Sequence, residues 1–174
     1  MTTSLRLPKK NRETVDFPEI QRYLRDRGVS LTRWNAAAPL KDDSSQEEIL
    51  KAYAHEVEPF MKAHGFLSAD VISVHPGTEN LPALREKFLR EHVHGEDEVR
   101  FFVDGEGKFW FHFDDGDVAC VTCVKGDFLS VPKGFRHWFD LAPKYHVKAI
   151  RIFTSKEGWV AQYTGSGIDR DYNP

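Results

Sequence analysis

The front part of the chain carries apolar positions mostly at the spacing of amphipathic helices. Three segments have this pattern: residues 16–28, 45–65 and 81–91. The second is the strongest, because Ser45 and Glu48 have capping-box spacing ahead of a long apolar stripe. Two short stretches between the helices have strand character: residues 29–34 and 70–74. Residues 1–16 are polar, and we expect them to form a loosely held arm.

From residue 92 the chain changes to short apolar stretches separated by turns rich in Gly, Asp, Lys and Pro. These stretches are residues 92–103, 108–113, 118–124, 127–131, 137–141 and 147–153. Strands of this length and spacing indicate an antiparallel sandwich or a small barrel. We therefore expect one mainly β domain over residues 1–174. Its parts are the arm (1–16), helices and short strands (17–90), a β-barrel core (91–155) and a C-terminal tail (156–174) that packs back on the body.

Length and composition agree with one globular domain. The 174 residues are 40% hydrophobic and 29% charged, which excludes a disordered, collagen-like or membrane-spanning chain. A formal net charge of −3 argues against a nucleic-acid partner held by bulk positive charge. No apolar run reaches the length of a membrane span, and the basic N-terminus lacks the apolar stretch of a signal peptide. We expect a cytoplasmic protein with no membrane partner, and a monomer is the default expectation.

The balance of histidine and cysteine bears on metal chemistry. The chain has eight His against two Cys, so a bound metal would be held by imidazole and carboxylate groups rather than by thiolates. Cys120 and Cys123 form a C-x-x-C pair, which can be a redox motif or half of a zinc site. Their surroundings are apolar and β-branched, and the chain has no second C-x-x-C pair. We interpret both cysteines as small apolar residues, in a reducing compartment.

Two histidines and a glutamate have the spacing of a metal site on one strand. His92 and His94 are two residues apart, so their side chains share a face of a strand. Glu98 has the same parity and joins them if the backbone makes one tight excursion at Gly95. Two imidazoles and a carboxylate on one face are the parts of a site for a divalent first-row metal. His137 is a candidate fourth ligand, although spacing alone leaves surface or core histidines as an open alternative.

Both histidine segments resemble the motifs of the cupin superfamily. Residues 92–105 read H-x-H-x3-E-x6-G, like the first cupin motif, and residues 126–137 read G-x5-P-x-G-x2-H, like the second. Glu86 stands where the first motif usually opens with Gly, and Leu141 where the second usually ends with Asn. Neither position belongs to the ligand set. The resemblance implies a cupin-type double-stranded β-helix, a jelly-roll barrel, with additional N-terminal α-helices.

Longer blocks around these motifs are similar to the acireductone dioxygenase family, the oxygenases of methionine salvage. The similar blocks are residues 84–105, 124–141, 148–153 and 157–165. In that family three His and one Glu hold the metal. The resemblance therefore implies His92, His94, Glu98 and His137 as ligands, with one Fe(II) or Ni(II) ion per chain as cofactor.

The resemblance also implies substrates and products. The substrate would be the acireductone 1,2-dihydroxy-3-keto-5-methylthiopentene, which reacts with O2. Family members with Fe(II) give formate and 4-methylthio-2-oxobutanoate, and those with Ni(II) give methylthiopropionate, formate and carbon monoxide. An enediol bound as its dianion is electron-rich enough to react with O2 directly, so the metal would serve chiefly as a Lewis acid and a template.

Arg100 is the candidate for binding substrate charge. It shares the parity of Glu98, so it should point inward beside the metal, where a guanidinium can neutralise oxyanions. The resemblance makes Arg100 a catalytic residue, with Glu91 and Asp97 as nearby acidic partners. Either acid could hold a ligating imidazole in one tautomer. The alternative is a structural ion pair of Arg100 with Glu91 or Glu96.

Other aromatic and histidine side chains have weaker assignments. Three aromatic residues are candidate walls of the substrate pocket, with core packing as the alternative: Phe102, Phe139 and Trp159. The remaining histidines lack ligand spacing, and we interpret them as surface or packing residues: His55, His64, His75, His112 and His146.

Two further functions stay open for a cupin. A metal-dependent sugar-phosphate isomerase or epimerase would need several Lys or Arg side chains aimed into the barrel to bind phosphate. Near the motifs only Arg100 qualifies by parity. In a non-catalytic cupin binding module the ligand histidines would typically be eroded, whereas all four ligands are present here.

Overall fold

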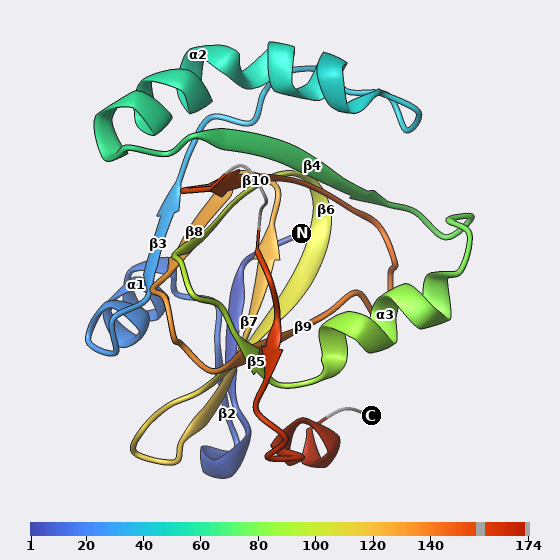
Figure 1. The fold of residues 1–174 in the computed structure, drawn as a ribbon. Coiled ribbons are helices and arrows are strands. Elements are labelled where there is room, and N and C mark those ends of the chain that lie inside the picture. Colours follow the sequence, from blue (N-terminus) through green and yellow to red (C-terminus); the bar gives the residue numbers. More distant parts are fainter. Residues whose placement is uncertain (156–158, 173–174) are drawn as a thin grey trace.

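Two antiparallel sheets that share one strand make up the body of the protein (Figure 1). The computed structural model describes residues 1–155 and 159–172. The strands are β1 (Ser4–Leu7), β2 (Arg12–Thr14), β3 (Ser30–Arg33), β4 (Ser68–Val74), β5 (His92–Val93), β6 (Glu98–His112), β7 (Val118–Val124), β8 (Asp127–Val131), β9 (His137–Asp140), β10 (Val147–Phe153) and β11 (Gln162–Tyr163). The first sheet has the order β11-β5-β9-β6-β7-β1-β2, and the second runs β4-β10-β6-β8-β3.

Helices lie outside the strands. They are α1 (Phe17–Arg25), α2 (Gln46–His64) and α3 (Leu81–Leu89). The predicted capping box of Ser45 and Glu48 is present at the start of α2, and Gly65 ends the helix in a left-handed conformation. Ile49 and Tyr53 of α2 are buried against the outer face of the second sheet. The helix thus forms a separate layer across that sheet (Figure 1).

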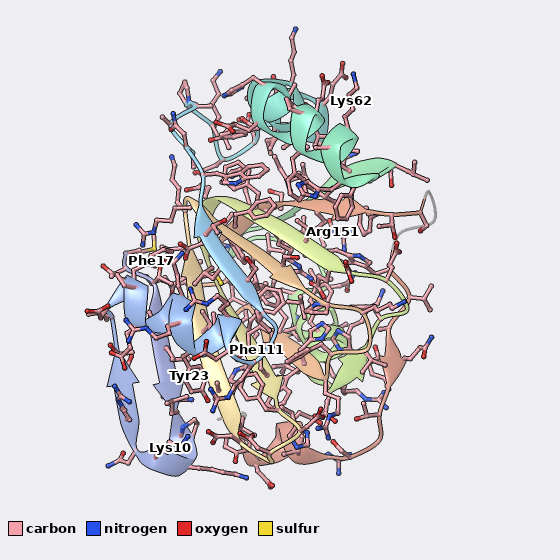
Figure 2. The ribbon with its side chains drawn as sticks, turned by 90° about the vertical axis from the view of Figure 1, so that its left-hand side faces the viewer. Lys10, Phe17, Tyr23, Lys62, Phe111 and Arg151 are labelled. Carbon is pink, nitrogen blue, oxygen red and sulfur yellow. The ribbon has the colours of Figure 1, made fainter. Side chains whose placement is uncertain are left out.

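The shared strand β6 sends alternate residues to two different cores. Its first part pairs with β8 and β10, and its last part pairs with β7 and β9. Phe102 and Phe111 lie in the core between the sheets, whereas Val99, Phe101 and Val103 pack under α2. Figure 2 shows Phe111 among the strands and α2 outside them. Because β6 is covered on both faces, consecutive apolar residues occur at 101–103 and again at 109–111 of this strand.

Gly105 lets β6 pass from one sheet to the other. The pattern predicts two strands here, separated by a turn, but β6 continues from Glu98 to His112. Gly105 has a φ of 68°, and a Cβ atom built on it would lie 2.1 Å from the carbonyl oxygen of His146. Glycine alone combines this backbone conformation with so close an approach. The D-G-E-G stretch is therefore an irregular point within one strand.

The N-terminal residues form a hairpin, so the prediction of a loosely held arm is wrong for them. β1 pairs with β2 on one side and with β7 on the other. Leu5 and Leu7 are 1% and 3% exposed and belong to the core between the sheets. These leucines alternate with polar residues, which is a strand period that the surrounding basic residues obscure.

The C-terminal tail covers the outer face of the first sheet. Its 3-10 helix (Ile168–Asp171) and Tyr172 pack on Trp110 and Trp138. Residues 156–158 and 173–174 of the predicted tail lie outside the described residues. Both cysteines are unpaired and buried in apolar clusters, which agrees with their interpretation as small apolar residues. Among the described residues, no helix has the length and apolar character needed to cross a membrane.

We expect Leu5→Ala to lower the free energy of unfolding by about 2–5 kcal/mol, because truncating a buried Leu leaves a cavity in the core. Val15→Ala is the matched control. Val15 is 62% exposed, and we expect a change within about 0.5 kcal/mol. Urea denaturation measures both variants, and equally small effects would show that the hairpin is not part of the core in solution.

Candidate metal centre

The four side chains predicted as metal ligands meet inside the barrel. His92 lies in β5, His94 follows that strand, Glu98 begins β6 and His137 begins β9. His92 and His137 are direct partners in the β5–β9 pairing, which sets their rings side by side. The ring centroids lie 4.5 Å (His92–His137), 4.9 Å (His92–His94) and 5.1 Å (His94–His137) apart. All four side chains are buried.

A tight turn joins the two motifs. Gly134, with a φ of 75°, lies in a turn closed by a bond from the Phe135 N–H to the Pro132 carbonyl (3.2 Å). The Gly134 N–H donates to the carbonyl of His94 (2.8 Å). The turn expected ahead of His137 is thus present and bonded to the first motif.

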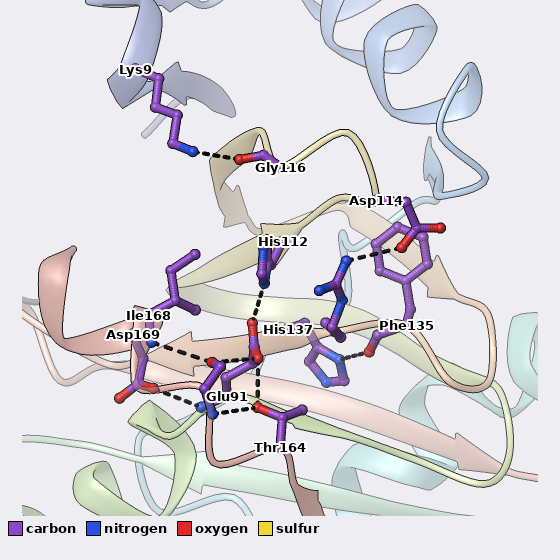
Figure 3. Close-up of polar contacts among 12 residues, drawn as sticks. Lys9, Glu91, His112, Asp114, Gly116, Phe135, His137, Thr164, Ile168 and Asp169 are labelled. Atoms are coloured by element: carbon purple, nitrogen blue, oxygen red, sulfur yellow. Dashed lines mark hydrogen bonds and ion pairs between the residues drawn. The ribbon is translucent and has the colours of Figure 1, made fainter.

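Each histidine of the cluster donates from Nδ1 to a backbone carbonyl. The acceptors are Arg90 for His92 (2.7 Å), Val160 for His94 (3.2 Å) and Phe135 for His137 (2.8 Å; Figure 3). A carbonyl oxygen cannot donate, so Nδ1 carries a hydrogen, and in the neutral imidazole the free lone pair is then on Nε2. The backbone therefore selects the tautomers, and the prediction that Glu91 or Asp97 orients a ligating imidazole is wrong.

Glu98 brings a carboxylate oxygen to these lone pairs. Its Oε2 lies 3.1 Å from Nε2 of His94 and 2.8 Å from Nε2 of His137, while Oε1 accepts from Nε of Arg100 (2.7 Å). Burial by itself raises the pKa of Glu98, but the charged Arg100 guanidinium beside it holds the pKa well below its usual value. Burial and then the neighbouring His137 lower the pKa of His92 to about 4, so its ring is neutral at pH 7.

The facing atoms of the cluster are all acceptors. Nε2 of His137 and Oε2 of Glu98 are buried and have no hydrogen-bond partner within the described residues. One ring nitrogen from each histidine lies within 4.8 Å of the other two. Lone pairs this close repel one another unless a cation lies between them. Imidazole nitrogens with a carboxylate oxygen are a donor set for divalent first-row metals, so the residues present fit such an ion.

Arg100 lies beside the cluster with part of its guanidinium unpaired. The residue is 4% exposed, and its Nη1 has no hydrogen-bond partner in the described part of the chain. The guanidinium lies 4.7 Å from the ring centroid of Phe139 and 5.4 Å from that of Trp159. Burial lowers the pKa of Arg100, but an arginine side chain stays charged at neutral pH. Arg100 therefore offers a free donor on a fixed cation.

A cavity of ≈ 370 Å³ opens onto two of the ligand imidazoles. Other residues that line it include Lys87, Phe88, Arg100, Arg151, Trp159 and Tyr163. Trp159 stacks on His94, with ring centroids 5.6 Å apart, and lines this cavity. Phe139 lies beneath Arg100 and Phe102 is fully buried in the core, so neither is among the residues that line this cavity.

Sequence reasoning missed Arg151, which supplies a second guanidinium. It stands opposite Arg100 in the β10–β6 pairing, so both side chains leave the same face of the sheet. Asp70 of β4 accepts from its Nε (2.7 Å) and its Nη2 (2.6 Å). Figure 2 labels this arginine. Val147, Ala149 and Arg151 are alternate residues of β10, so their side chains share a face, and the first two face the inner core. This alternation is the sequence signal that could have predicted an inward-facing Arg151.

Glu91 lies away from the facing lone pairs and anchors the C-terminal segment (Figure 3). Its carboxylate accepts from Oγ1 of Thr164 (2.5 Å), Oγ of Ser166 (2.7 Å) and Nδ1 of His112 (2.7 Å). Burial raises the pKa of Glu91, but these hydrogen bonds outweigh it and the pKa is lowered. Within the described residues Glu91 makes no ion pair with Arg100.

The loop before β6 is tied down by its own acids. Oδ1 of Asp97 accepts from the Lys133 N–H (2.9 Å), and the Asp97 carbonyl accepts from Nε1 of Trp159 (3.2 Å). Glu96 accepts from the Thr154 N–H (3.1 Å). Both acids thus fasten the loop between two ligands to neighbouring segments instead of pairing with Arg100.

Comparison with known proteins places the chain in a family. A sequence model of the ARD/ARD′ family matches residues 2–161. The chain belongs to this family. An acireductone dioxygenase of Picosynechococcus sp. is 48% identical to it over 170 residues, which cover 98% of this chain and 97% of that protein. An acireductone dioxygenase of Pseudomonas savastanoi pv. phaseolicola is 47% identical over 158 residues, 91% of this chain and 87% of that protein.

A solved structure agrees with this assignment. Acireductone dioxygenase from Bacillus anthracis, with a cadmium ion in its active centre, matches with a TM-score of 0.84 and 34% identity. The match covers 93% of this chain and 98% of that chain. It confirms the predicted mainly β, cupin-type fold, and the family match confirms the resemblance found in the sequence. As an ARD/ARD′ member the chain is an oxidoreductase, and its three-histidine cluster supports metal binding.

We expect His94→Ala to lose most of the bound divalent metal and to stay folded, because the apolar cores around the centre support the barrel. His75→Ala is the control, since His75 is exposed and outside the cluster. Elemental analysis after dialysis gives the metal content, and circular dichroism reports folding. Unchanged metal content would contradict the site, and unfolding of His94→Ala would show a structural metal.

Proposed function

We propose that the chain is a dioxygenase that cleaves the acireductone 1,2-dihydroxy-3-keto-5-methylthiopentene with O2, using one Fe(II) or Ni(II) ion held by His92, His94, Glu98 and His137. One observation carries this proposal: buried acceptor atoms of His137 and Glu98 lack hydrogen-bond donors within the described residues, and the unpaired Nη1 of Arg100 lies beside them. They adjoin a cavity that ligand imidazoles line, in a chain that belongs to the ARD/ARD′ family. We infer formate and 4-methylthio-2-oxobutanoate as products with Fe(II), and methylthiopropionate, formate and CO with Ni(II).

One ion per chain is supported by the contrast with a second group of ligand atoms. Asp42, Asp104 and His146 also lie close together, but Asp42 is exposed. Asp104 already accepts from His146 (2.9 Å) and has Lys148 at 3.8 Å, which opposes a further cation. We propose a monomer as the working unit. The free cysteines agree with the cytoplasm, the compartment that we propose.

The metal supplies Lewis acidity and a template for the substrate's oxygens when it is bound. The chain's own residues supply charge and shape around it. Arg100 donates from Nη1 to a substrate oxygen, an interaction that strengthens as negative charge develops there. Arg151, held by Asp70, adds a second fixed cation to the same cavity. Trp159 covers His94 and restricts access of water to the reacting atoms.

Glu91 and Asp97 act as positioning residues in this proposal. Glu91 holds the C-terminal segment next to His92, and Asp97 holds the turn ahead of His137 and the indole of Trp159. Neither carboxylate is bonded to a ligand ring in the described residues.

The other two functions considered from the sequence are less well supported. The cavity is lined by three cationic side chains, as a phosphate site would be, so its charge fits either reaction and other observations must distinguish the two. A binding module without catalysis does not explain the complete ligand set. Membership of a dioxygenase family favours the oxygenase over both.

We expect protein reconstituted with Fe(II) or Ni(II) to consume O2 when acireductone is added, and the nickel form to release CO. An oxygen electrode and gas chromatography measure the two outcomes. The metal-free protein is the control. Absence of turnover with either metal, in protein shown to contain that metal, would overturn the proposed function.

We expect Arg100→Gln to lower kcat/KM by about 10²–10³-fold, the usual cost of removing one preorganised donor from a developing oxyanion. Metal content should stay high because all four ligands remain. Arg12→Gln, in an exposed pair on the N-terminal hairpin, is the matched control and should be unchanged. An Arg100→Gln variant with full activity would remove this residue from the mechanism.

A further inference from the structure

We propose that Tyr163 sets the length of the apolar tail that the site accepts, an inference that rests on the proposed acireductone function. Tyr163 lines the cavity beside His92, and none of the sequence patterns marks it as a site residue. It comes from β11, a two-residue strand that follows Trp159 in the chain. Tyr163 therefore lies at the rim of this cavity.

Aromatic rings run in a chain from one end of the site to the other. Trp159 stacks on His94 (5.6 Å), His94 lies 4.9 Å from His92, and His92 lies 6.1 Å from Tyr163, all between ring centroids. The ligand imidazoles are therefore in the middle, with Trp159 at one end and Tyr163 at the other.

The two ends differ in chemistry. The Trp159 end holds both guanidinium groups, with Arg100 at 5.4 Å and Arg151 at 5.6 Å from the indole. At the Tyr163 end, Lys87 of α3 lines the cavity and its carbonyl accepts from the Tyr163 hydroxyl, and the next residue, Phe88, also lines the cavity. An oxygen-rich head group is favoured beside the two fixed guanidinium groups, and an alkylthio tail beside Phe88, the Tyr163 ring and the apolar stem of Lys87. The substrate's tail therefore points from the metal towards Tyr163.

Several contacts fix the tyrosine ring at the rim. Tyr163 is the direct partner of His92 in the β11–β5 pairing. Its hydroxyl donates to the carbonyl of Lys87 (3.1 Å), and the Arg90 guanidinium lies over its ring at 4.2 Å. The next residue, Thr164, is bonded to Glu91. Because these contacts hold the ring in one position, it blocks a longer tail and cannot rotate aside to admit one.

The exposure of Tyr163 makes it the boundary between cavity and solvent. The residue is 40% exposed, whereas the ligand histidines behind it are buried. A substrate tail that ends before the Tyr163 ring is buried in the cavity. Each methylene beyond the ring must displace the ring or be exposed to water. One methylene more or less in an apolar pocket changes kcat/KM by roughly 10–200-fold.

The test uses metal-loaded protein and acireductones whose tails differ by one methylene. For wild type we expect kcat/KM to fall beyond the natural tail length. For Tyr163→Ala we expect the ratio of long-tail to natural-tail kcat/KM to rise about 10-fold, the lower end of a single-methylene effect. Tyr163→Phe keeps the ring and should keep the wild-type profile. Tyr163→Trp enlarges the ring and should shift the profile towards shorter tails.

Dissociation constants of the same acireductones, measured without O2, do not depend on turnover. We expect them to show the same tail-length preference in each variant as kcat/KM. Tyr172→Ala is the matched control for loosened docking of the C-terminal segment. Tyr172 packs on Trp110 (5.7 Å) and does not line the cavity. The inference would be overturned if kcat/KM depended on tail length in the same way in wild type, Tyr163→Ala and Tyr163→Trp. It would also be overturned if Tyr172→Ala changed the tail-length preference as much as Tyr163→Ala does. A wild-type protein that turns over no acireductone would instead overturn the proposed function.

Discussion

Three imidazole nitrogens and a carboxylate oxygen face one another inside the barrel, and all are acceptors. The hydrogens are held elsewhere, because each Nδ1 donates to a backbone carbonyl. Moving a hydrogen to Nε2 would break one of those bonds in a buried place, where an unpaired polar group is costly. A cation between the acceptors removes the conflict without any such loss. The register of His92 with His137, and the bond from Gly134 to His94, keep the four side chains converged.

Strand β6 ties this centre to the rest of the fold. Glu98 and Arg100 point to the centre, while Val99 and Phe101 point to the core under α2. A slip of one residue in the pairing of β6 would exchange these faces and bury the two charges under the helix. Packing of α2 therefore supports the placement of a ligand and of the cation beside it. Gly105 permits the same strand to continue into the other sheet.

Sequence reasoning could predict features that depend on local period and spacing. The shared parity of Glu98 and Arg100 and the turn before His137 are features of this kind. The N-terminal hairpin was missed because its strand period covers only Leu5 and Leu7 in a basic segment. The tautomers could not be predicted, because their partners are backbone carbonyls, which every residue carries. Lys87, Phe88 and Tyr163 reach the cavity only through the docking of α3 and β11, for which no spacing in the sequence gives evidence.

The facing acceptors of His92, His94, Glu98 and His137 form one metal centre in the function that we propose. The X-ray absorption spectrum of the protein loaded with one equivalent of Fe(II) or Ni(II) tests it most directly. We expect scattering from three imidazole rings, with the remaining metal-bound atoms all nitrogen or oxygen. A spectrum with fewer than three imidazoles, or with a sulfur ligand from Cys120 or Cys123, would contradict it.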